Sequence, residues 1–208
     1  MKITKSVAAL LVGGAMGASA QSTIYTSESA FVAALPSGYY LENFSSQTAF
    51  AGPLSSLSFS GGAPTVNYTI TADPAGLFIN NDSGLNAVGN YNSGNDVLVT
   101  FTSSNVYAAG AEFYLNNLAG ANQNGSITIN FSGGATGSAP SSATGSYGFF
   151  GINSTTPISS MTVVHDANYF INLANLYSGA TPVPEPATGL VLLTGIAGLA
   201  CARWRKLF

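Results

Sequence analysis

The sequence offers few ionisable side chains that could carry out a reaction. Glycoside hydrolysis needs two carboxylates at a defined separation, and Glu42 and Glu112 are the candidates, although no sequence spacing pairs them. Acyl transfer needs a nucleophile, a base and an orienting group. The single histidine, His165, is followed by Asp166, but no G-x-S-x-G motif supplies the nucleophile. Glu112 lies on an otherwise polar strand face, so we expect it to be solvated. We predict no catalytic residue and no enzyme activity.

Oxygen ligands that suit calcium occur at two places in the chain. They are Asn80-Asn81-Asp82-Ser83-Gly84 and the pair Asn95-Asp96. Neither follows the D-x-[DN]-x-[DN]-G pattern, and Asn, Asp and Gly are also common turn residues. The single cysteine excludes a cysteine-rich zinc site. We therefore predict no metal ligand and no cofactor, with calcium as the open alternative.

Carbohydrate binding would use aromatic rings as platforms, with amides and hydroxyls as hydrogen-bonding partners. The sequence has ten tyrosines, and the candidates for such platforms are Tyr39, Tyr40, Tyr91, Tyr114 and Tyr147. Because β-sheets favour tyrosine in any case, each of these residues also fits a structural role.

The distribution of charge limits the partners that the chain can have. Only 6% of its 208 residues are charged, while 46% are hydrophobic, which excludes a charge-rich disordered chain. All five cations lie at the two ends, and the stretch between Ala20 and Arg203 holds all eight acids. Nucleic-acid binding requires cations that replace phosphate counterions, so we exclude nucleic acid as a partner. Other anionic polymers are poor partners for the same reason.

Residues 1–20 have the three parts of a secretory signal peptide in order. Lys2 and Lys5 give a positive start, an apolar run extends from Val7 to about Ala15, and Ala18-Ser19-Ala20 is a small-residue cleavage site. Cleavage after Ala20 would leave Gln21 as the first residue. We therefore expect the protein to be exported.

Residues 181–208 predict a C-terminal transmembrane helix with a basic stop. Ala187 to Ala202 is apolar and would span ~24 Å as a helix, somewhat short of a ~30 Å hydrocarbon core. The flanking Arg203, Arg205 and Lys206 can extend to the membrane surface, and the span must end where they begin. The positive-inside rule places this basic end in the cytoplasm and the preceding domain on the far side.

Just before this helix stands Val183-Pro184-Glu185-Pro186. The motif, the short Gly/Ala/Leu-rich helix and the terminal basic cluster together resemble the PEP-CTERM sorting tag of Gram-negative bacteria. The resemblance implies that a membrane protease, an exosortase, recognises Pro184, Glu185 and Pro186 and processes an inner-membrane-anchored precursor. The mature protein would reach the cell surface or an extracellular, exopolysaccharide-rich biofilm matrix. The two prolines fix φ and remove backbone donors, so we expect an extended, exposed segment.

Residues 21–180 predict a single all-β domain. One helix is expected over Ser29–Leu35, capped by Thr26 or Ser27. Alternation places Ile127, Ile129 and Phe131 on one face, and it places Tyr107, Ala109, Ala111, Phe113 and Leu115 on another, with Glu112 and Tyr114 opposite. About ten short strands separated by Gly, Asn and Asp turns indicate an antiparallel β-sandwich, jelly-roll-like, with a barrel as the alternative. Its core should include Val97, Val99, Phe101 and Phe113, and Gly133–Gly145 should be a flexible loop.

This domain also resembles, more loosely, domains that often precede the same tag. The resemblance rests on Glu42-Asn43-Phe44, Phe149-Phe150-Gly151-Ile152 and Ala174-Asn175-Leu176-Tyr177-Ser178-Gly179, with Ala174 where such domains usually have Asp. It implies a sandwich related to carbohydrate-binding modules. Two functions follow as hypotheses: a non-catalytic surface or matrix protein that binds exopolysaccharide, or a secreted carbohydrate-active enzyme on a jelly-roll scaffold.

Overall fold

The computed structural model describes residues 21–82, 84–164 and 169–180. Within these segments the chain forms fourteen strands and one short helix. In chain order they are β1 (Ser22–Tyr25), α1 (Glu28–Ala34), β2 (Tyr40–Glu42), β3 (Leu57–Gly61), β4 (Val66–Thr71), β5 (Leu77–Asp82), β6 (Leu85–Asn90), β7 (Val97–Phe101), β8 (Ala108–Asn116), β9 (Asn122–Gln123), β10 (Gly125–Phe131), β11 (Thr136–Ser141), β12 (Gly148–Ser154), β13 (Ser160–Val164) and β14 (Phe170–Gly179).

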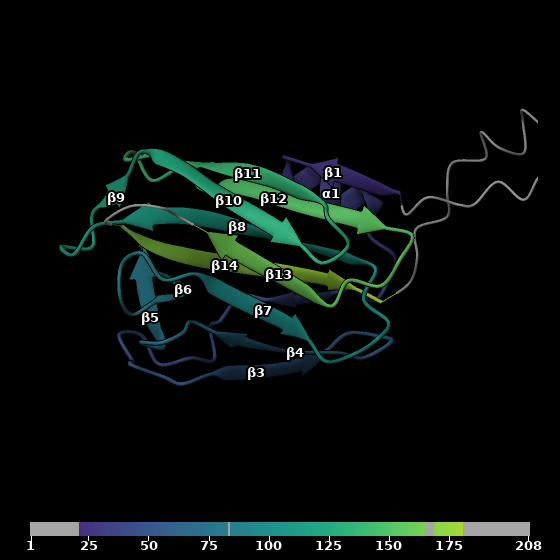
Figure 1. Cartoon of the computed structure of the whole chain (residues 1–208), viewed down its shortest axis with the longest axis horizontal. Helices are drawn as coiled ribbons and strands as arrows, with labels where there is room; N and C mark the ends of the chain where they lie inside the picture. Colours follow the sequence, from purple (N-terminus) through teal and green to yellow (C-terminus); the bar gives the residue numbers. More distant parts are fainter. Residues whose placement is uncertain (1–20, 83, 165–168, 181–208) are drawn as a thin grey trace, which may run out of the picture.

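The strands form two antiparallel sheets that pack face to face (Figure 1). One sheet has eight strands, in the order β1-β12-β8-β14-β6-β5, with β2 beside β14 and β9 beside β8. The other has six, in the order β11-β10-β13-β7-β4-β3. The prediction of an all-β sandwich is therefore confirmed.

From β6 onward the chain passes repeatedly from one sheet to the other. Strands β6, β8, β12 and β14 belong to the eight-stranded sheet, whereas β7, β10, β11 and β13 belong to the six-stranded sheet. The last strand, β14, lies between β8 and β6. Segments far apart in the sequence therefore contribute neighbouring side chains to one sheet face.

The hydrophobic core lies between the two sheets. Alternate residues of the central strands point into it, and the residues predicted for it on β7, β8 and β10 are all buried: Val97, Val99, Phe101, Phe113, Ile127, Ile129 and Phe131. Burying each such side chain contributes about 1.5–3 kcal/mol relative to an exposed one. The period-two pattern thus identified the correct inner faces.

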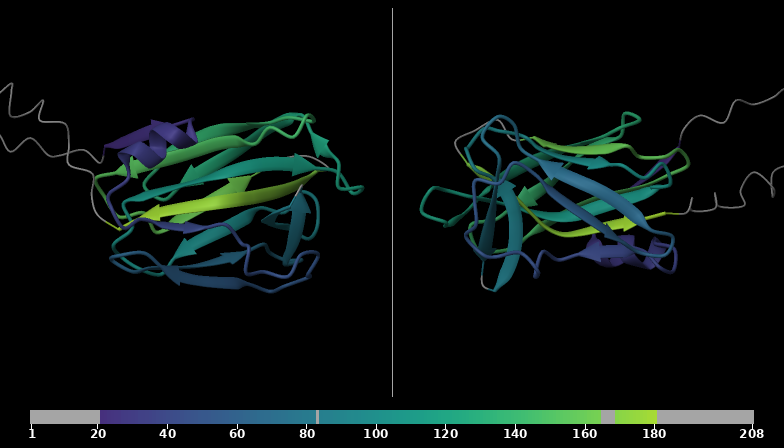
Figure 2. Two further views of the ribbon diagram at one scale, coloured as in Figure 1. Left: turned by 180° about the vertical axis from the view of Figure 1, so that it is seen from behind. Right: turned by 90° about the horizontal axis from the view of Figure 1, so that it is seen from below.

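The helix α1 covers part of the outer face of the eight-stranded sheet (Figure 2). Ser27 is its N-cap, as predicted, and accepts a hydrogen bond from the backbone of Ala30. The buried ring of Phe31 packs against Phe149 and Tyr177 in a small second cluster. The sheet beneath it has Gly110 and Gly151, where a Cβ would lie 3.1 Å from the Phe31 ring.

One sequence prediction about the strands of this domain was wrong. Residues 133–145 are not wholly a loop, because β11 lies within them and pairs with β10 along its whole length. Tyr114 does lie opposite the inward-facing residues of β8, as predicted, but it is only 1% exposed, because Tyr147, Ala87 and Ala174 pack around it on the outer face. This sheet is therefore buried in part on both faces.

Both ends of the described chain emerge at one end of the sandwich (Figure 1). Gln21 accepts a hydrogen bond from the backbone of Thr155, and Gly179 accepts one from Tyr107. These partners adjoin the paired ends of β12 and β8, where Asn153 lies opposite Ala108. The first residue of β14, Phe170, lies at the opposite end of the sheet, about 30 Å away along a ten-residue strand.

Candidate functional site

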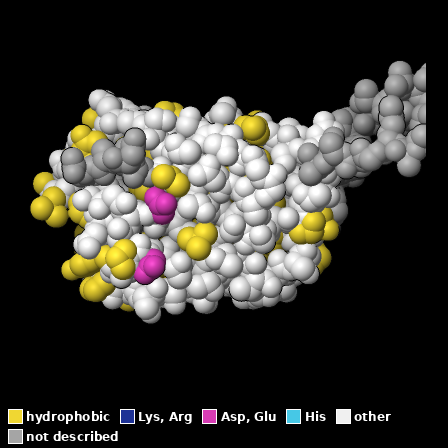
Figure 3. All heavy atoms as spheres, viewed as in Figure 1, with side chains coloured by type: hydrophobic (Ala, Val, Ile, Leu, Met, Phe, Trp, Pro, Cys, Tyr) yellow, Lys and Arg dark blue, Asp and Glu magenta, His cyan; other side chains and the backbone are white. Residues whose placement is uncertain are grey.

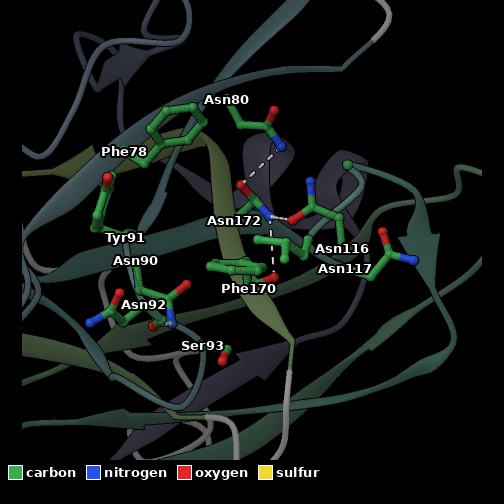
Figure 4. A pocket seen from close by; sticks show the side chains of 12 residues that line it. Phe78, Asn80, Asn90, Tyr91, Asn92, Ser93, Asn116, Asn117, Phe170 and Asn172 are labelled. Atoms are coloured by element: carbon green, nitrogen blue, oxygen red, sulfur yellow. Dashed lines mark hydrogen bonds between the residues drawn. The ribbon is translucent and has the colours of Figure 1, made fainter.

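A cavity of about 620 Å³ opens at that opposite end, on the outer face of the eight-stranded sheet. Its lining comes from β5, β6, β8, β14 and two adjoining loops (Figure 4). The lining contains no Lys, Arg, His, Asp or Glu. It consists of Phe78, Asn80, Asn90, Tyr91, Asn92, Ser93, Asn116, Asn117, Leu118, Gly120, Phe170 and Asn172. The cavity is therefore uncharged and rich in amides.

Asn172 is the centre of a chain of amide hydrogen bonds across three strands. Its amide nitrogen donates to Asn116 Oδ1 (2.6 Å) and to the carbonyl of Phe170 (3.2 Å), while its Oδ1 accepts from Asn80 Nδ2 (3.3 Å) (Figure 4). Each amide is thereby held in one orientation. Amides offer both donors and acceptors, so the cluster can bind hydroxyl groups in either role.

A glycine on β6 makes this chain possible. Asn80 on β5 reaches across β6 to Asn172 on β14, and Gly89 lies opposite Asn172 in the register. A Cβ at Gly89 would lie 2.8 Å from Asn172 Oδ1, within the space that the amide occupies. The strand between the two amides therefore carries no side chain at this point.

The β6–β7 loop is fixed against the cavity by Asn90. Its amide nitrogen donates to the carbonyls of Asn92 and Asn95 (both 2.8 Å), and its Oδ1 accepts from the backbone of Ile171 (2.8 Å). One buried amide thus ties this loop to β14 and sets the positions of Tyr91 and Ser93 at the rim. The rim is preorganised, which reduces the entropy cost of binding.

A tyrosine pair with a carboxylate lies on the same sheet face. The rings of Tyr114 and Tyr147 are 4.8 Å apart, and the Tyr147 hydroxyl donates to Asp82 (2.9 Å). Asp82 also accepts from Asn122 Nδ2 (2.9 Å). Burial, with the Asp82 carboxylate as hydrogen-bond acceptor, raises the pKa of Tyr147 to about 12. Tyr147 is therefore a neutral donor at ordinary pH.

Glu112 differs from its predicted solvated state. It is half-buried and accepts a hydrogen bond from Asn175 Nδ2 (2.6 Å). Asn175 has φ +47° where the β14–β8 register shifts, and this bulge is where its amide meets Glu112. Burial raises the pKa of Glu112, the Asn175 hydrogen bond lowers it, and the nearby Glu28 raises it further. The net shift is upward because desolvation is the largest cause.

We expect Glu112→Gln to stabilise the domain at neutral pH. A raised pKa means that the folded state holds the proton of Glu112 more tightly than the unfolded chain does. The contribution of Glu112 to stability is therefore present below its ordinary pKa of 4.5. It is lost as the pH rises through the pKa of Glu112 in the folded state. Gln stays neutral and can still accept from Asn175. Urea unfolding should show a higher midpoint for the variant at pH 7 and none of this gain below about pH 4. A variant that is less stable than the wild type at pH 7 would contradict the role of burial.

The two glutamates considered for hydrolysis are not brought together. Glu42 lies opposite Leu176, which faces the core, whereas Glu112 lies opposite Ala174 and Phe149, which face outward. The two carboxylates are therefore on opposite faces of the sheet. Glu42 accepts from the Tyr40 hydroxyl (2.6 Å) and from the backbone of Phe44 (2.7 Å), which accounts structurally for the Glu42-Asn43-Phe44 motif.

The two possible calcium segments are also apart. In the β5–β6 hairpin, Asp82 lies at the turn, opposite Leu85, whereas Asn95 follows the other end, where Leu77 lies opposite Asn90. No group of three or more His, Cys, Asp or Glu side chains converges among the described residues. Of the proposed tyrosine platforms, Tyr91 lines the cavity and is 43% exposed, whereas Tyr114 is too buried to serve.

Several predicted residues lie outside the part that the structure describes. They are His165, Asp166, the signal-peptide residues Ala18 and Ala20, the sorting motif Pro184, Glu185 and Pro186, and the basic stop Arg203, Arg205 and Lys206. Within residues 21–82, 84–164 and 169–180, no helix has the length and apolar character needed to cross a membrane.

Fold and cavity together define an all-β, two-sheet domain with an uncharged, amide-lined site at one end. No protein-family model and no curated protein matches the chain. A solved structure to which it is similar is titled "Crystal structure of Agl-KA catalytic domain", at 14% identity and a TM-score of 0.31 over 68% of this chain. The chain spans 30% of that structure's length.

Proposed function

We propose that this chain is an exported surface or matrix protein, sorted through a C-terminal PEP-CTERM tag, whose body is a non-catalytic carbohydrate-binding sandwich. The ends of the sequence support export and anchoring, through the signal-like residues 1–20 and the Pro-Glu-Pro, apolar and basic segments of 181–208. The precursor is anchored in the inner membrane, and a membrane protease processes it. Exopolysaccharide is the partner at the cell surface.

A jelly roll is the finer description of the body that the strand order supports. The inner eight strands run β6-β14-β8-β12 in one sheet and β7-β13-β10-β11 in the other. In both sheets a strand from the end of the chain lies between earlier ones, as two interleaved Greek keys require. Strands β1, β3, β4 and β5 then extend the edges.

The observation that carries carbohydrate binding is the chemistry of the cavity. A neutral sugar presents hydroxyl groups at its rim and C–H groups on its faces. Asn80, Asn116 and Asn172 supply donors and acceptors, while Phe78, Tyr91 and Phe170 supply apolar ring surface. Residues 21–180 contain no Lys or Arg, so anionic sugars would meet no opposite charge.

We expect the protein to bind neutral polysaccharides. Asn80→Ala should weaken that binding about tenfold, because the lost hydrogen bonds would cost about 1.4 kcal/mol of binding free energy. The full chain, purified in a detergent without a sugar head group, is run through native gels that contain dextran, galactomannan, mixed-linkage glucan, alginate or hyaluronate. Retardation should occur in one or more of the three neutral gels and in neither anionic gel.

The matched control is Asn130→Ala. Asn130 is also half-buried and also follows an isoleucine, but it lies on β10 of the other sheet. It should leave retardation unchanged. Equal losses in the two variants, or retardation in the anionic gels alone, would contradict a neutral-sugar site at the cavity.

A secreted carbohydrate-active enzyme is the second candidate, and one observation favours it. Glu112 has a raised pKa, as a general acid requires, and both Glu112 and Asp82 act electrostatically on Tyr147. Neither carboxylate lines the cavity. This candidate would be favoured over a binding module if the wild type released reducing ends from the polysaccharides that it binds and if Glu112→Gln did not.

A further inference from the structure

An aromatic strip runs from the cavity onto the open surface. Phe78 and Tyr91 line the cavity, with ring centroids 6.3 Å apart. Phe50, in the segment between β2 and β3, continues the strip with its ring 6.4 Å from that of Phe78. Phe50 is 66% exposed. The three rings therefore form a path that leads out of the cavity over the edge strand β5.

Folding does not explain why Phe50 is a phenylalanine. Its backbone has φ +62°, in the left-handed region that Asn and Gly adopt more readily than an aromatic residue. The position is fixed, because the backbone of Phe50 donates to the Ile79 carbonyl (2.8 Å) on β5. A large apolar side chain in this unfavourable conformation, left mostly in solvent, adds little to the core. Its ring is available to a ligand.

The segment that carries Phe50 is held closely against Phe78. A Cβ at Gly52 would lie 2.9 Å from the Phe78 ring and 2.9 Å from the Leu77 carbonyl, so only glycine allows this approach. Leu54 and Leu77 exchange backbone hydrogen bonds (2.8 and 2.9 Å) just beyond it. The strip is thus part of the rigid fold.

The strip and the cavity lie at the end of the sandwich away from both chain ends. Leu118, in the β8–β9 loop on the other rim of the cavity, is 89% exposed. Figure 3 shows hydrophobic side chains gathered toward β5 and β9 at this end of the visible face. A membrane anchor in residues 187–202 would be joined to the sandwich at the opposite end, where β14 ends.

We propose that the strip of Phe50, Phe78 and Tyr91 and the amide cavity form one continuous groove that binds a neutral polysaccharide lengthwise, over several sugar units. This inference rests on the proposed function. It adds that the ligand is several sugar units long and that it lies along the groove. Successive rings support successive sugar faces, and the Asn80–Asn172–Asn116 amides bind the hydroxyls of the unit in the cavity. A ligand confined to the cavity would leave Phe50 without a role.

The polymer must be uncharged for two reasons. Residues 21–180 have no Lys or Arg to bind an anionic chain, and the groove residues named here have no carboxylate to attract a cationic one. An apolar peptide would leave the amides of the cavity without their hydrogen bonds to water, which is costly for buried polar groups.

The test compares long and short fragments of the neutral polysaccharide that retards the wild-type chain most strongly. Isothermal titration measures the full chain, in the same sugar-free detergent, against a six-unit and a two-unit fragment. The wild type should bind the longer fragment about tenfold more tightly, since each further ring adds contact area. Phe50→Asn should remove most of that ratio, and its melting temperature should be equal or higher because Asn tolerates positive φ.

Ile24→Ala is the control, because Ile24 is 50% exposed on β1 at the opposite end. It should leave the ratio unchanged. A ratio near one in the wild type, or an unchanged ratio in Phe50→Asn, would overturn the lengthwise groove while leaving binding in the cavity intact. Failure of the wild type to bind any neutral fragment would instead overturn the proposed carbohydrate function.

Discussion

Replacing Glu185 with Ala is expected to leave the chain as an uncleaved, membrane-retained precursor. Glu185 is the one charge in Pro182-Val183-Pro184-Glu185-Pro186, where prolines at alternate positions oppose both helix and interior strand. A processing enzyme that recognises this segment therefore has one ionic group to bind. The substitution should leave the sandwich folded, because the last described strand of the sandwich ends at Gly179, before Glu185. Intact-mass measurement on membrane and medium fractions would show the full C-terminus retained.

Two further variants separate the charge of Glu185 from its shape and from acidity in general. Glu185→Gln keeps the size and removes the charge, and should behave as Glu185→Ala does. Asp96→Ala removes an exposed acid from the sandwich and should be processed normally. If all three chains were processed like the wild type, the segment would be only a linker before a simple membrane anchor.

The parts of the fold that the sequence predicted correctly are those in which one strand face is apolar. Ile127, Ile129 and Phe131 alternate with polar residues, and burial of one face of β10 follows directly. Strand β11 was missed because its sequence, TGSAPS, consists of small residues and a proline that are typical of loops. It forms a strand because β10 supplies six paired positions beside it. That partner is tertiary information, which a local pattern does not contain.

The cavity was not predicted because its signal is not unique in the sequence. Asn80, Asn116 and Asn172 each follow an Ile or Leu that enters the core, so alternation places each amide on an outer face. The same dipeptide occurs at Ile129-Asn130 and Ile152-Asn153, which lie elsewhere. Only the insertion of β14 between β8 and β6 decides which of these amides meet. Sequence spacing cannot indicate that arrangement.

The absence of cations from residues 21–180 has a visible structural counterpart. Hydroxyls and amides replace Lys and Arg as partners of the acids: Tyr40 donates to Glu42, Tyr147 and Asn122 to Asp82, Asn175 to Glu112, and Tyr177 to Glu28. Burial raises the pKa of Tyr40 and Tyr177, and their hydrogen bonds to Glu42 and Glu28 raise it further. Because these donors are neutral, the acids keep their net negative charge, and this charge repels anionic polymers from the surface.

Phe150→Ala should cause a large loss of stability, about 3–5 kcal/mol out of the 5–15 kcal/mol that is typical of a folded domain. Phe150 is 2% exposed and projects from β12 across the core. Its ring packs 6.1 Å from that of Phe131 on β10, so it connects the two sheets. Urea unfolding at pH 7 would measure the loss. A cost below about 1 kcal/mol would mean that the sheets do not pack through this ring.

Gly137 on β11 provides a sharper test of the same contact, within the segment that was predicted to be a loop. A Cβ at Gly137 would overlap the Phe150 ring, so Gly137→Ala alone should cost about 1–3 kcal/mol through overpacking. In the Phe150→Ala background the new methyl group has room, and the second substitution should cost little. The double-mutant cycle should therefore show strong coupling between the two sites, where distant sites would be additive within about 0.5 kcal/mol. If the free-energy changes of the two substitutions were simply additive, β11 would lie away from Phe150. A loop without fixed contact to that ring would not be affected by its removal.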